Sequence, residues 1–293
     1  MDLKKYYLRR LTRLEPPYIL AVLLLFVLAL TVQGESAGSL FPHLAASLFY
    51  LHGLVYGSFS PVIGVGWSLE IEIQFYLLVP LLTSLFMIHS RRARRAAMVA
   101  AIFLLLSLQV LFLPQSHRMA LSILAYLQFF LAGFILADIY VADWKQSPRR
   151  TFYWDVVSTC AWPALMVMLH SNALTHWLFP FVVLLLYCSA FRGRVSSRIF
   201  RNPFLTVIGG MCYSIYLLHY EVISAVGRHT KTIAEGAPYY IYLLVQFALI
   251  ALPIVVICGI YFVAIEKPCM RRDWPQRLWQ LAHRTPARMP VAQ

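Results

Sequence analysis

The chain is organised as a series of long apolar runs separated by short polar or basic segments. A helix needs about 20 apolar residues to cross a hydrocarbon layer of roughly 30 Å. Eight runs come close to this length, and we predict that each forms a membrane-spanning helix. They cover residues 17–33, 67–89, 96–114, 119–140, 152–170, 174–191, 204–226 and 238–264. The pattern therefore predicts an all-α, polytopic integral membrane protein.

The segment 40–60 departs from this pattern, because it is shorter, less apolar and dotted with Gly, Ser and His. We predict an external loop here, with a re-entrant or interfacial piece. The alternative is a ninth span.

The basic residues distinguish these two alternatives. If residues 1–16 are cytoplasmic, alternate loops carry 22 of the 25 Lys and Arg residues. This asymmetry is the positive-inside signature, and a ninth span would invert every later loop and destroy it. We therefore predict that both termini are cytoplasmic. The net charge of +13 is then explained by orientation and by contact with anionic membrane lipid, so no nucleic-acid partner is expected.

Composition supports this assignment. Of the 293 residues, 60% are hydrophobic and 13% are charged, whereas charged residues make up about 25% of a soluble domain. The five cysteines are odd in number and show no paired spacing, which favours packing roles over disulfides or a metal site. We predict a membrane domain over 1–268 and a basic cytoplasmic tail over 269–293.

Two carboxylates, Glu70 and Glu72, lie at the head of the run that begins at Trp67. An ionisable group in the hydrocarbon region costs a few kcal/mol, so it normally faces protein or a water-filled cavity. Glu72 and Tyr76 are four residues apart and share a helix face, whereas Glu70 points to the opposite side. These carboxylates fit either a buried hydrogen-bonding centre or a catalytic, substrate-orienting role.

Arg10 and Arg13 end a basic cluster at a membrane entry. Three residues apart, they can share a helix face and form a fork for phosphates; the plainer interpretation is a charge anchor. Pro16 and Pro17 follow, and we expect them at the start of the first spanning helix, where a missing N–H costs little.

Two further polar segments lie near the C-terminus. Tyr216 and His219 are three residues apart, so His219 is either a packing histidine or an acid, base or hydrogen-bond donor inside the membrane. Glu266 and Pro268 close the last run. We expect Pro268 to stop the helix and Glu266 to pair with a neighbouring basic residue.

Taken together and in this order, these segments resemble the membrane-bound acyltransferase 3 family. The resemblance rests on Arg-Arg-x-x-Arg-x-x-Pro-Pro (9–17), Trp-Ser-Leu-x-x-Glu-x-x-Phe-Tyr (67–76), Tyr-Ser-x-Tyr-Leu-x-His (213–219) and Glu-Lys-Pro (266–268). The structural motif positions among these are Trp67, Ser68, Tyr213, Tyr216, Glu266 and Pro268. Each segment alone is weak evidence for the family, whereas the ordered set is fairly specific for it and covers almost the whole chain.

The resemblance implies transfer of an acyl group, usually acetyl, from cytoplasmic acyl-CoA to a hydroxyl of a glycan or lipid-linked saccharide. It implies a bacterial cytoplasmic (inner) membrane location and no metal. By position, Arg10 and Arg13 fall on the acyl-CoA side. Glu72, Tyr76 and His219 match the core motifs and are the candidate catalytic residues.

One departure from the family pattern is evident. The family has ten spans, and its first contains a basic residue followed eleven positions later by a histidine. This chain opens at the segment that matches the region after the second span, so we expect an N-terminally truncated member. Whether it is active without the two missing spans is an open question.

A polytopic transporter or glycolipid flippase using the carboxylates is the alternative function, and a non-catalytic membrane partner is a third. The acceptor, the acyl chain and the oligomeric state stay open.

Overall fold

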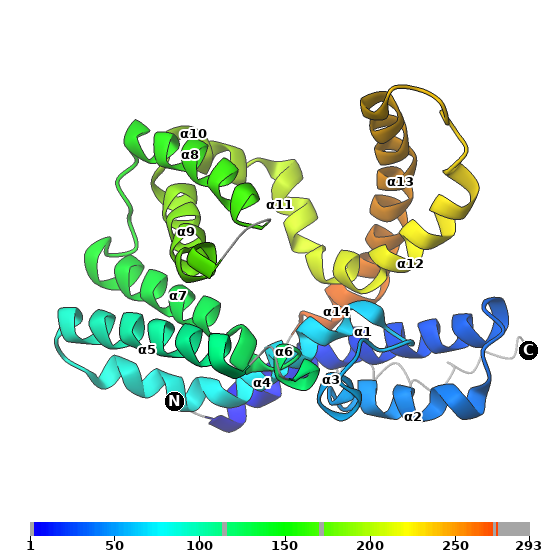
Figure 1. Ribbon diagram of the computed structural model, residues 1–293, viewed down its shortest axis with the longest axis horizontal. Coiled ribbons are helices and arrows are strands. Elements are labelled where there is room, and N and C mark those ends of the chain that lie inside the picture. Colours follow the sequence, from blue (N-terminus) through cyan, green and yellow to red (C-terminus); the bar gives the residue numbers. More distant parts are fainter. Residues whose placement is uncertain (1–2, 113–115, 170–172, 272–273, 275–293) are drawn as a thin grey trace, which may run out of the picture. The chain divides into compact units, whose positions relative to one another are not determined.

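The computed structural model describes residues 3–112, 116–169, 173–271 and 274, and these residues form helices and no β-strand (Figure 1). The chain divides into two compact units. Unit 1 comprises Met1–Val27 and Met211–Gln293, and unit 2 comprises Leu28–Gly210. Most of the predicted tail, 272–273 and 275–293, lies outside the described residues.

Unit 1 contains most of α1 (Leu3–Val32) and a hairpin of α12 (Cys212–Thr230) and α13 (Tyr239–Tyr261). The two hairpin helices run side by side in Figure 1. Their connection is fixed because the Gln246 amide donates to the Thr230 carbonyl at 2.7 Å. A π-helical turn and the short α14 (Lys267–Cys269) follow α13.

The first helix corrects one sequence-based expectation. It begins at Leu3, and Pro16 and Pro17 lie inside it rather than at its start. Pro16 has no N–H, so the carbonyl of Thr12 loses its helical donor. The indole N–H of Trp274 donates to that carbonyl at 2.9 Å. Tertiary contacts thus compensate for a helix break that the sequence alone would predict.

The described residues of unit 2 form the end of α1 and ten further α-helices, joined in places by short 3₁₀ and π turns. They are α2 (Ala37–Leu48), α3 (His52–Tyr56), α4 (Trp67–Leu82), α5 (Arg91–Phe112), α6 (His117–Ala120), α7 (Leu127–Asp138), α8 (Phe152–Met168), α9 (Ala173–Arg192), α10 (Arg194–Phe200) and α11 (Pro203–Gly210). The segment 40–60, predicted as an external loop with a re-entrant or interfacial piece, is therefore mostly helical. The helix α2 has 12 residues, which is too short for a span.

The core of unit 2 lies between α5 and α7. Met98, Ile102 and Leu106, spaced four apart along α5, pack against Leu131 and Ile135 of α7. The first turn of α5 is tied to the end of α7, because one carboxylate, Asp138, accepts from both Arg94 and Arg95. Arg94 and Asp138 are buried and Arg95 is half-buried, so the charges are paired as a low-dielectric site requires.

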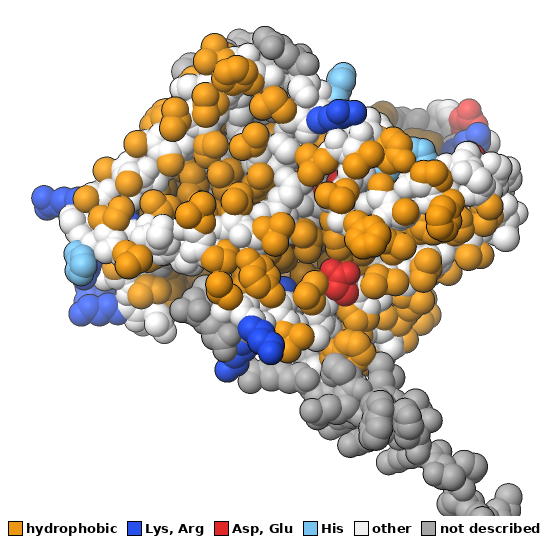
Figure 2. Space-filling model, turned by 90° about the horizontal axis from the view of Figure 1, so that it is seen from below, with side chains coloured by type: hydrophobic (Ala, Val, Ile, Leu, Met, Phe, Trp, Pro, Cys, Tyr) orange, Lys and Arg blue, Asp and Glu red, His pale blue; other side chains and the backbone are white. Residues whose placement is uncertain are grey.

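A helix forms within each of the eight predicted ranges. Among the described residues, five helical segments are long and apolar enough to cross a membrane: Leu3–Val32, Gly64–Met87, Arg91–Phe112, Thr175–Arg192 and Tyr239–Cys269. The other three ranges are shorter or interrupted; the run 204–226, for example, breaks between α11 and α12. Apolar side chains cover much of the face drawn in Figure 2. The protein is thus an all-α, polytopic integral membrane protein.

Candidate functional site

The two carboxylates at the head of α4 have different surroundings. Glu70 is 2% exposed, and its carboxylate accepts from the Gly53 N–H at 2.7 Å. This amide lies in the first turn of α3 and has no helical partner of its own. Gly53 also leaves little room, since a Cβ there would lie 3.1 Å from the Glu70 carboxylate. Glu70 therefore caps α3 and serves structure.

Glu72 is half-buried on a different face of α4. The hydroxyl of the buried Tyr76 donates to its Oε1 atom, as the spacing of four predicted. This contact leaves Oε2 as a further acceptor. The sequence-based hypotheses of a structural centre and a functional carboxylate thus apply to different residues, Glu70 and Glu72.

A pair of histidines lies beside this carboxylate region, in the segment 40–60. His43 Nδ1 is 2.8 Å from His52 Nε2, and His52 Nδ1 is 3.1 Å from the Ser58 carbonyl. The ring of Tyr56 covers both imidazoles, with centroids 4.4 and 4.7 Å away. Burial lowers the pKa of His52, which is 1% exposed, and so favours its neutral form.

The hydrogen bonds fix the tautomers of this pair. A carbonyl only accepts, so His52 Nδ1 carries the proton and donates to Ser58. His52 Nε2 is then an acceptor, and His43 Nδ1 must donate to it. His43 Nε2 is left with a lone pair on a half-buried side chain, and within the described residues it has no hydrogen-bond partner. Such an imidazole can accept a proton from a substrate.

Sequence analysis missed this pair. His43 and His52 are nine residues apart, which fits no helical or metal-ligand spacing. They meet because the chain turns between α2 and α3, where Tyr50 adopts a positive φ of 57°. The nearest sequence signal is two histidines in a weakly apolar segment just before a carboxylate motif.

The third candidate catalytic residue, His219, lies on α12 in unit 1. Its Nδ1 is 3.0 Å from the carbonyls of Ile215 and Tyr216, one turn earlier on the same helix. Carbonyls only accept, so Nδ1 is protonated and Nε2 holds a lone pair. The side chain is half-buried. The geometry fits an acid–base role as well as a packing role.

Arg10 and Arg13 lie on α1 and belong to unit 1. Both are exposed, as a site for a soluble phosphate ligand would require. The guanidinium of Arg10 lies over the Tyr6 ring, 5.8 Å from its centroid. This contact holds the guanidinium against an aromatic face.

The remaining motif residues of unit 1 form a structural network. Glu266 is 3% exposed, and its Oε2 accepts from Ser214 through the backbone N–H at 3.0 Å and the hydroxyl at 2.5 Å. The neighbouring Tyr213 hydroxyl donates to the Leu14 carbonyl of α1 at 3.1 Å. Contrary to expectation, within the described part of the chain the partner of Glu266 is a serine rather than a basic residue. Pro268 lies in α14, which ends one residue later.

Replacement of Glu266 by alanine is therefore expected to destabilise unit 1. It leaves the Ser214 amide buried without an acceptor, which costs about 1–3 kcal/mol. Glu266→Gln should recover part of the loss, because its amide oxygen still accepts. The melting temperature in detergent measures this, with exposed Glu235 replaced by alanine as the control. Equal melting temperatures for the two alanine variants would contradict the assignment.

The predicted site residues thus fall into two sets. In unit 2, Glu72 and Tyr76 are in contact, and Trp67 lies between Phe59 and Tyr126, with ring centroids 6.0 and 5.5 Å away. Ser68 is half-buried in the first turn of α4. In unit 1 are Arg10, Arg13, Tyr213, Tyr216, His219, Glu266 and Pro268. The described residues contain no group of three or more His, Cys, Asp or Glu side chains that could hold a metal ion.

Comparison with known proteins identifies the relationship. The family model described as an acyltransferase domain, Acyl_transf_3, matches residues 1–264. A Staphylococcus aureus (strain COL) protein, provisionally named an O-acetyltransferase, is 27% identical in an alignment of 269 positions that covers 83% of this chain and 44% of that protein. The O-acetyltransferase OatA of S. aureus (strain NCTC 8325 / PS 47) is 24% identical in an alignment of 301 positions that covers 94% of this chain and 48% of OatA.

The chain therefore spans about half the length of these relatives. No solved structure matches it. The family match covers all of α1 to α13, including the carboxylate motif of α4 and the histidine motif of α12. The chain belongs to the acyltransferase 3 family.

Proposed function

We propose that this protein is a membrane O-acyltransferase that moves an acyl group, acetyl in the first instance, from acyl-CoA to a hydroxyl of a glycan or lipid-linked saccharide. The observation that carries the proposal is the His43–His52 pair, which leaves one imidazole lone pair available for an acceptor hydroxyl. Family membership supports the reaction class, and the names of the relatives support acetyl as the group.

On the acceptor side, His43 Nε2 removes the proton of the acceptor hydroxyl as its oxygen attacks the thioester carbonyl carbon. A C–O bond forms, the C–S bond breaks, and the sulfur leaves as the thiolate of CoA. Positive charge then develops on His43, and the lone pair of His52 Nε2 stabilises it through the Nδ1–H. His52 is thus a positioning residue. The free oxygen of Glu72 orients the acceptor.

On the donor side, we assign the phosphates of acyl-CoA to Arg10 and Arg13, which are exposed and three residues apart on α1. We also assign an acid–base role on the donor side to His219, whose Nε2 atom holds a lone pair. The charge asymmetry of the loops supports a cytoplasmic location for these arginines. It also supports both termini on the cytoplasmic side, and the bacterial cytoplasmic membrane is the location that the family resemblance implies.

The direct test uses the purified full chain in nanodiscs with labelled acetyl-CoA and a lipid-linked glycan. Label in the glycan, lost on mild alkaline ester hydrolysis, is the expected result. Absence of transfer to every hydroxyl acceptor tried, from protein that still binds acetyl-CoA, would overturn the assignment of the reaction to this chain.

Arg10→Ala combined with Arg13→Ala is expected to weaken acyl-CoA binding by about 100-fold or more, because each of the two charge-assisted hydrogen bonds contributes about 1.5–3 kcal/mol. Equilibrium binding of a non-hydrolysable acyl-CoA analogue measures it. The control removes the same charge elsewhere, with Arg92→Ala and Arg228→Ala, both exposed. A transporter or flippase that uses the carboxylates would keep its transport activity in the Arg10/Arg13 variant, and that result would favour the alternative function.

A further inference from the structure

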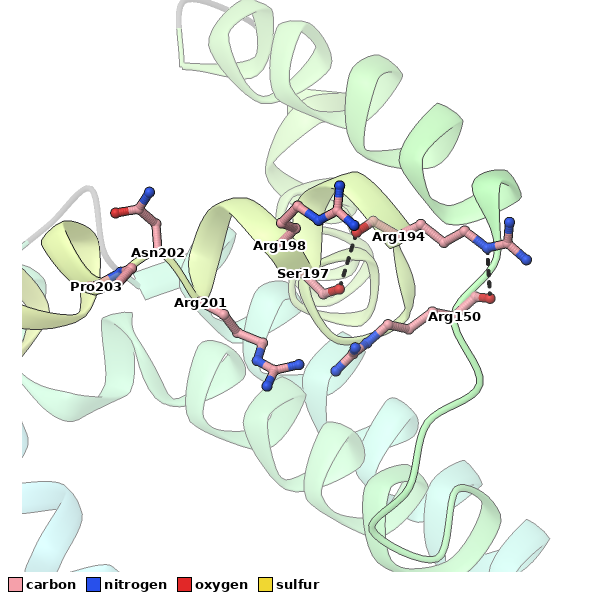
Figure 3. Close-up of a pocket in the computed structure, with 7 residues that line it drawn as sticks. All are labelled: Arg150, Arg194, Ser197, Arg198, Arg201, Asn202 and Pro203. Atoms are coloured by element: carbon pink, nitrogen blue, oxygen red, sulfur yellow. Dashed lines mark hydrogen bonds between the residues drawn. The ribbon is translucent and has the colours of Figure 1, made fainter.

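A second cluster of arginines surrounds a pocket in unit 2 that the proposed reaction does not use (Figure 3). The pocket has a volume of about 700 Å³. Its lining is Arg150, Arg194, Ser197, Arg198, Arg201, Asn202 and Pro203. Four exposed guanidinium groups thus come from two parts of the chain: the segment before α8, and α10 with its C-terminal connection.

The backbone that carries these arginines is held mostly by groups other than their side chains, and Arg194 Nε adds one bond to the Arg150 carbonyl at 3.5 Å. The Thr151 N–H donates to the Arg192 carbonyl at 2.9 Å. The Asp155 carboxylate accepts from the backbone N–H groups of Arg194 and Ser196, each at 2.9 Å. A Cβ on Gly193 would lie 2.5 Å from Asp155 Oδ1, so only glycine fits at this junction. The two segments are therefore fixed beside each other, and so is the place where their arginines converge.

The charges in this pocket are not neutralised by the protein. Within the described parts of the chain, no carboxylate forms an ion pair with Arg150, Arg194, Arg198 or Arg201. Another arginine cluster in the same unit shows the opposite arrangement, because Arg94 and Arg95 share Asp138, and Arg95 also pairs with Asp143 at 2.7 Å. Four like charges around one concave surface create a strongly positive potential that attracts anions.

The orientation of the side chains fits a bridging anion. In Figure 3 the guanidinium ends of Arg150 and Arg201 point toward each other across the pocket. Two cations aimed at one volume repel each other unless an anion lies between them. Planar guanidinium groups match the oxygens of a phosphate by paired N–H donors. The hydroxyl of Ser197 and the amide of Asn202 add neutral polar groups to the lining.

We propose that this pocket binds a phosphate ester. Two sources carry this chemistry: the headgroup of an anionic phospholipid and a soluble phosphorylated molecule. Apolar side chains next to the pocket favour the lipid, since Ile199 and Phe200 are 52% and 50% exposed and Phe204 is 80% exposed. Such side chains can contact acyl chains while the arginines hold the phosphate, as basic pockets at helix ends do. The proposal is independent of the acyl-transfer assignment.

The experiment compares three phosphate probes on the purified full chain in neutral detergent. Native mass spectrometry counts bound phosphatidylglycerol, phosphatidylcholine serves as the lipid of zero net charge, and inorganic pyrophosphate is the soluble competitor. We expect Arg150→Ala combined with Arg201→Ala to weaken phosphatidylglycerol binding about tenfold or more, because two charge-assisted contacts are lost. The matched control removes two exposed charges elsewhere, with Arg9→Ala and Arg92→Ala, and should bind like the wild type.

The results of this experiment distinguish a lipid headgroup, a soluble phosphate and a nonspecific effect of charge. Saturable binding of phosphatidylglycerol that the pocket variant loses supports the lipid headgroup as ligand. Binding of pyrophosphate that the same variant loses, with no preference for the anionic lipid, supports a soluble phosphate. Equal losses in the pocket variant and in the control would overturn the proposal, because the arginines would then act only as part of the general positive charge of the loops.

Discussion

Replacement of His43 by alanine is expected to lower the rate of acyl transfer by about 10²–10⁴-fold, the usual contribution of a positioned general base. The effect should fall on kcat, with the KM for acyl-CoA little changed, because the phosphate contacts lie elsewhere. The measurement is steady-state transfer of labelled acetyl to a glycan acceptor. The exposed His117, replaced by alanine in the same unit, is the matched control.

The partner histidine provides a sharper form of this test. His52 touches no substrate in the proposed mechanism and acts only through His43 Nδ1. His52→Ala should therefore lower kcat less than His43→Ala does, and the double variant should be no slower than His43→Ala alone. Independent roles would instead multiply the two losses. Wild-type kcat in a folded His43→Ala variant would remove this residue from the mechanism.

The contact between the two histidines could not be predicted from the sequence, whereas other features could. Long-range hydropathy predicted helices in all eight ranges, because a span of about 20 apolar residues is a strong signal. The i,i+4 spacing likewise predicted the Glu72–Tyr76 contact, because both residues lie on one helix. The meeting of His43 with His52 depends on a turn between two short helices, and no periodicity encodes it.

The double proline of α1 shows a second limit. Local rules expected Pro16 and Pro17 at a helix start, since a proline inside a helix costs about 3 kcal/mol. The helix nevertheless continues through both residues. Two side chains distant in sequence bond to carbonyls in this region: Tyr261 donates to the Pro17 carbonyl at 2.5 Å, and Trp274 donates to that of Thr12. Tertiary hydrogen bonds, which rules based on neighbouring residues cannot include, therefore outweigh the low helix propensity of the two prolines.

Substitutions at the two carboxylates of α4 are expected to have different effects, one on stability and the other on the rate of acyl transfer. Glu70→Ala removes the acceptor of the Gly53 amide in the first turn of α3, where the carboxylate is 2% exposed. Each unsatisfied buried donor costs about 1–3 kcal/mol, so the melting temperature in detergent should fall. The segment that carries His43 and His52 should loosen as well, because α3 begins at His52.

Glu72→Ala is expected to produce the opposite result. Its carboxylate is half-buried and bonds to a hydroxyl that can turn toward other acceptors, so the melting temperature should stay close to that of the wild type. The rate of acyl transfer should fall, because the acceptor loses the oxygen that orients it. Glu72→Gln, which keeps one acceptor oxygen, should recover part of the rate. If Glu72→Ala unfolds the protein while folded Glu70→Ala loses kcat, the structural and functional roles of the two carboxylates are reversed.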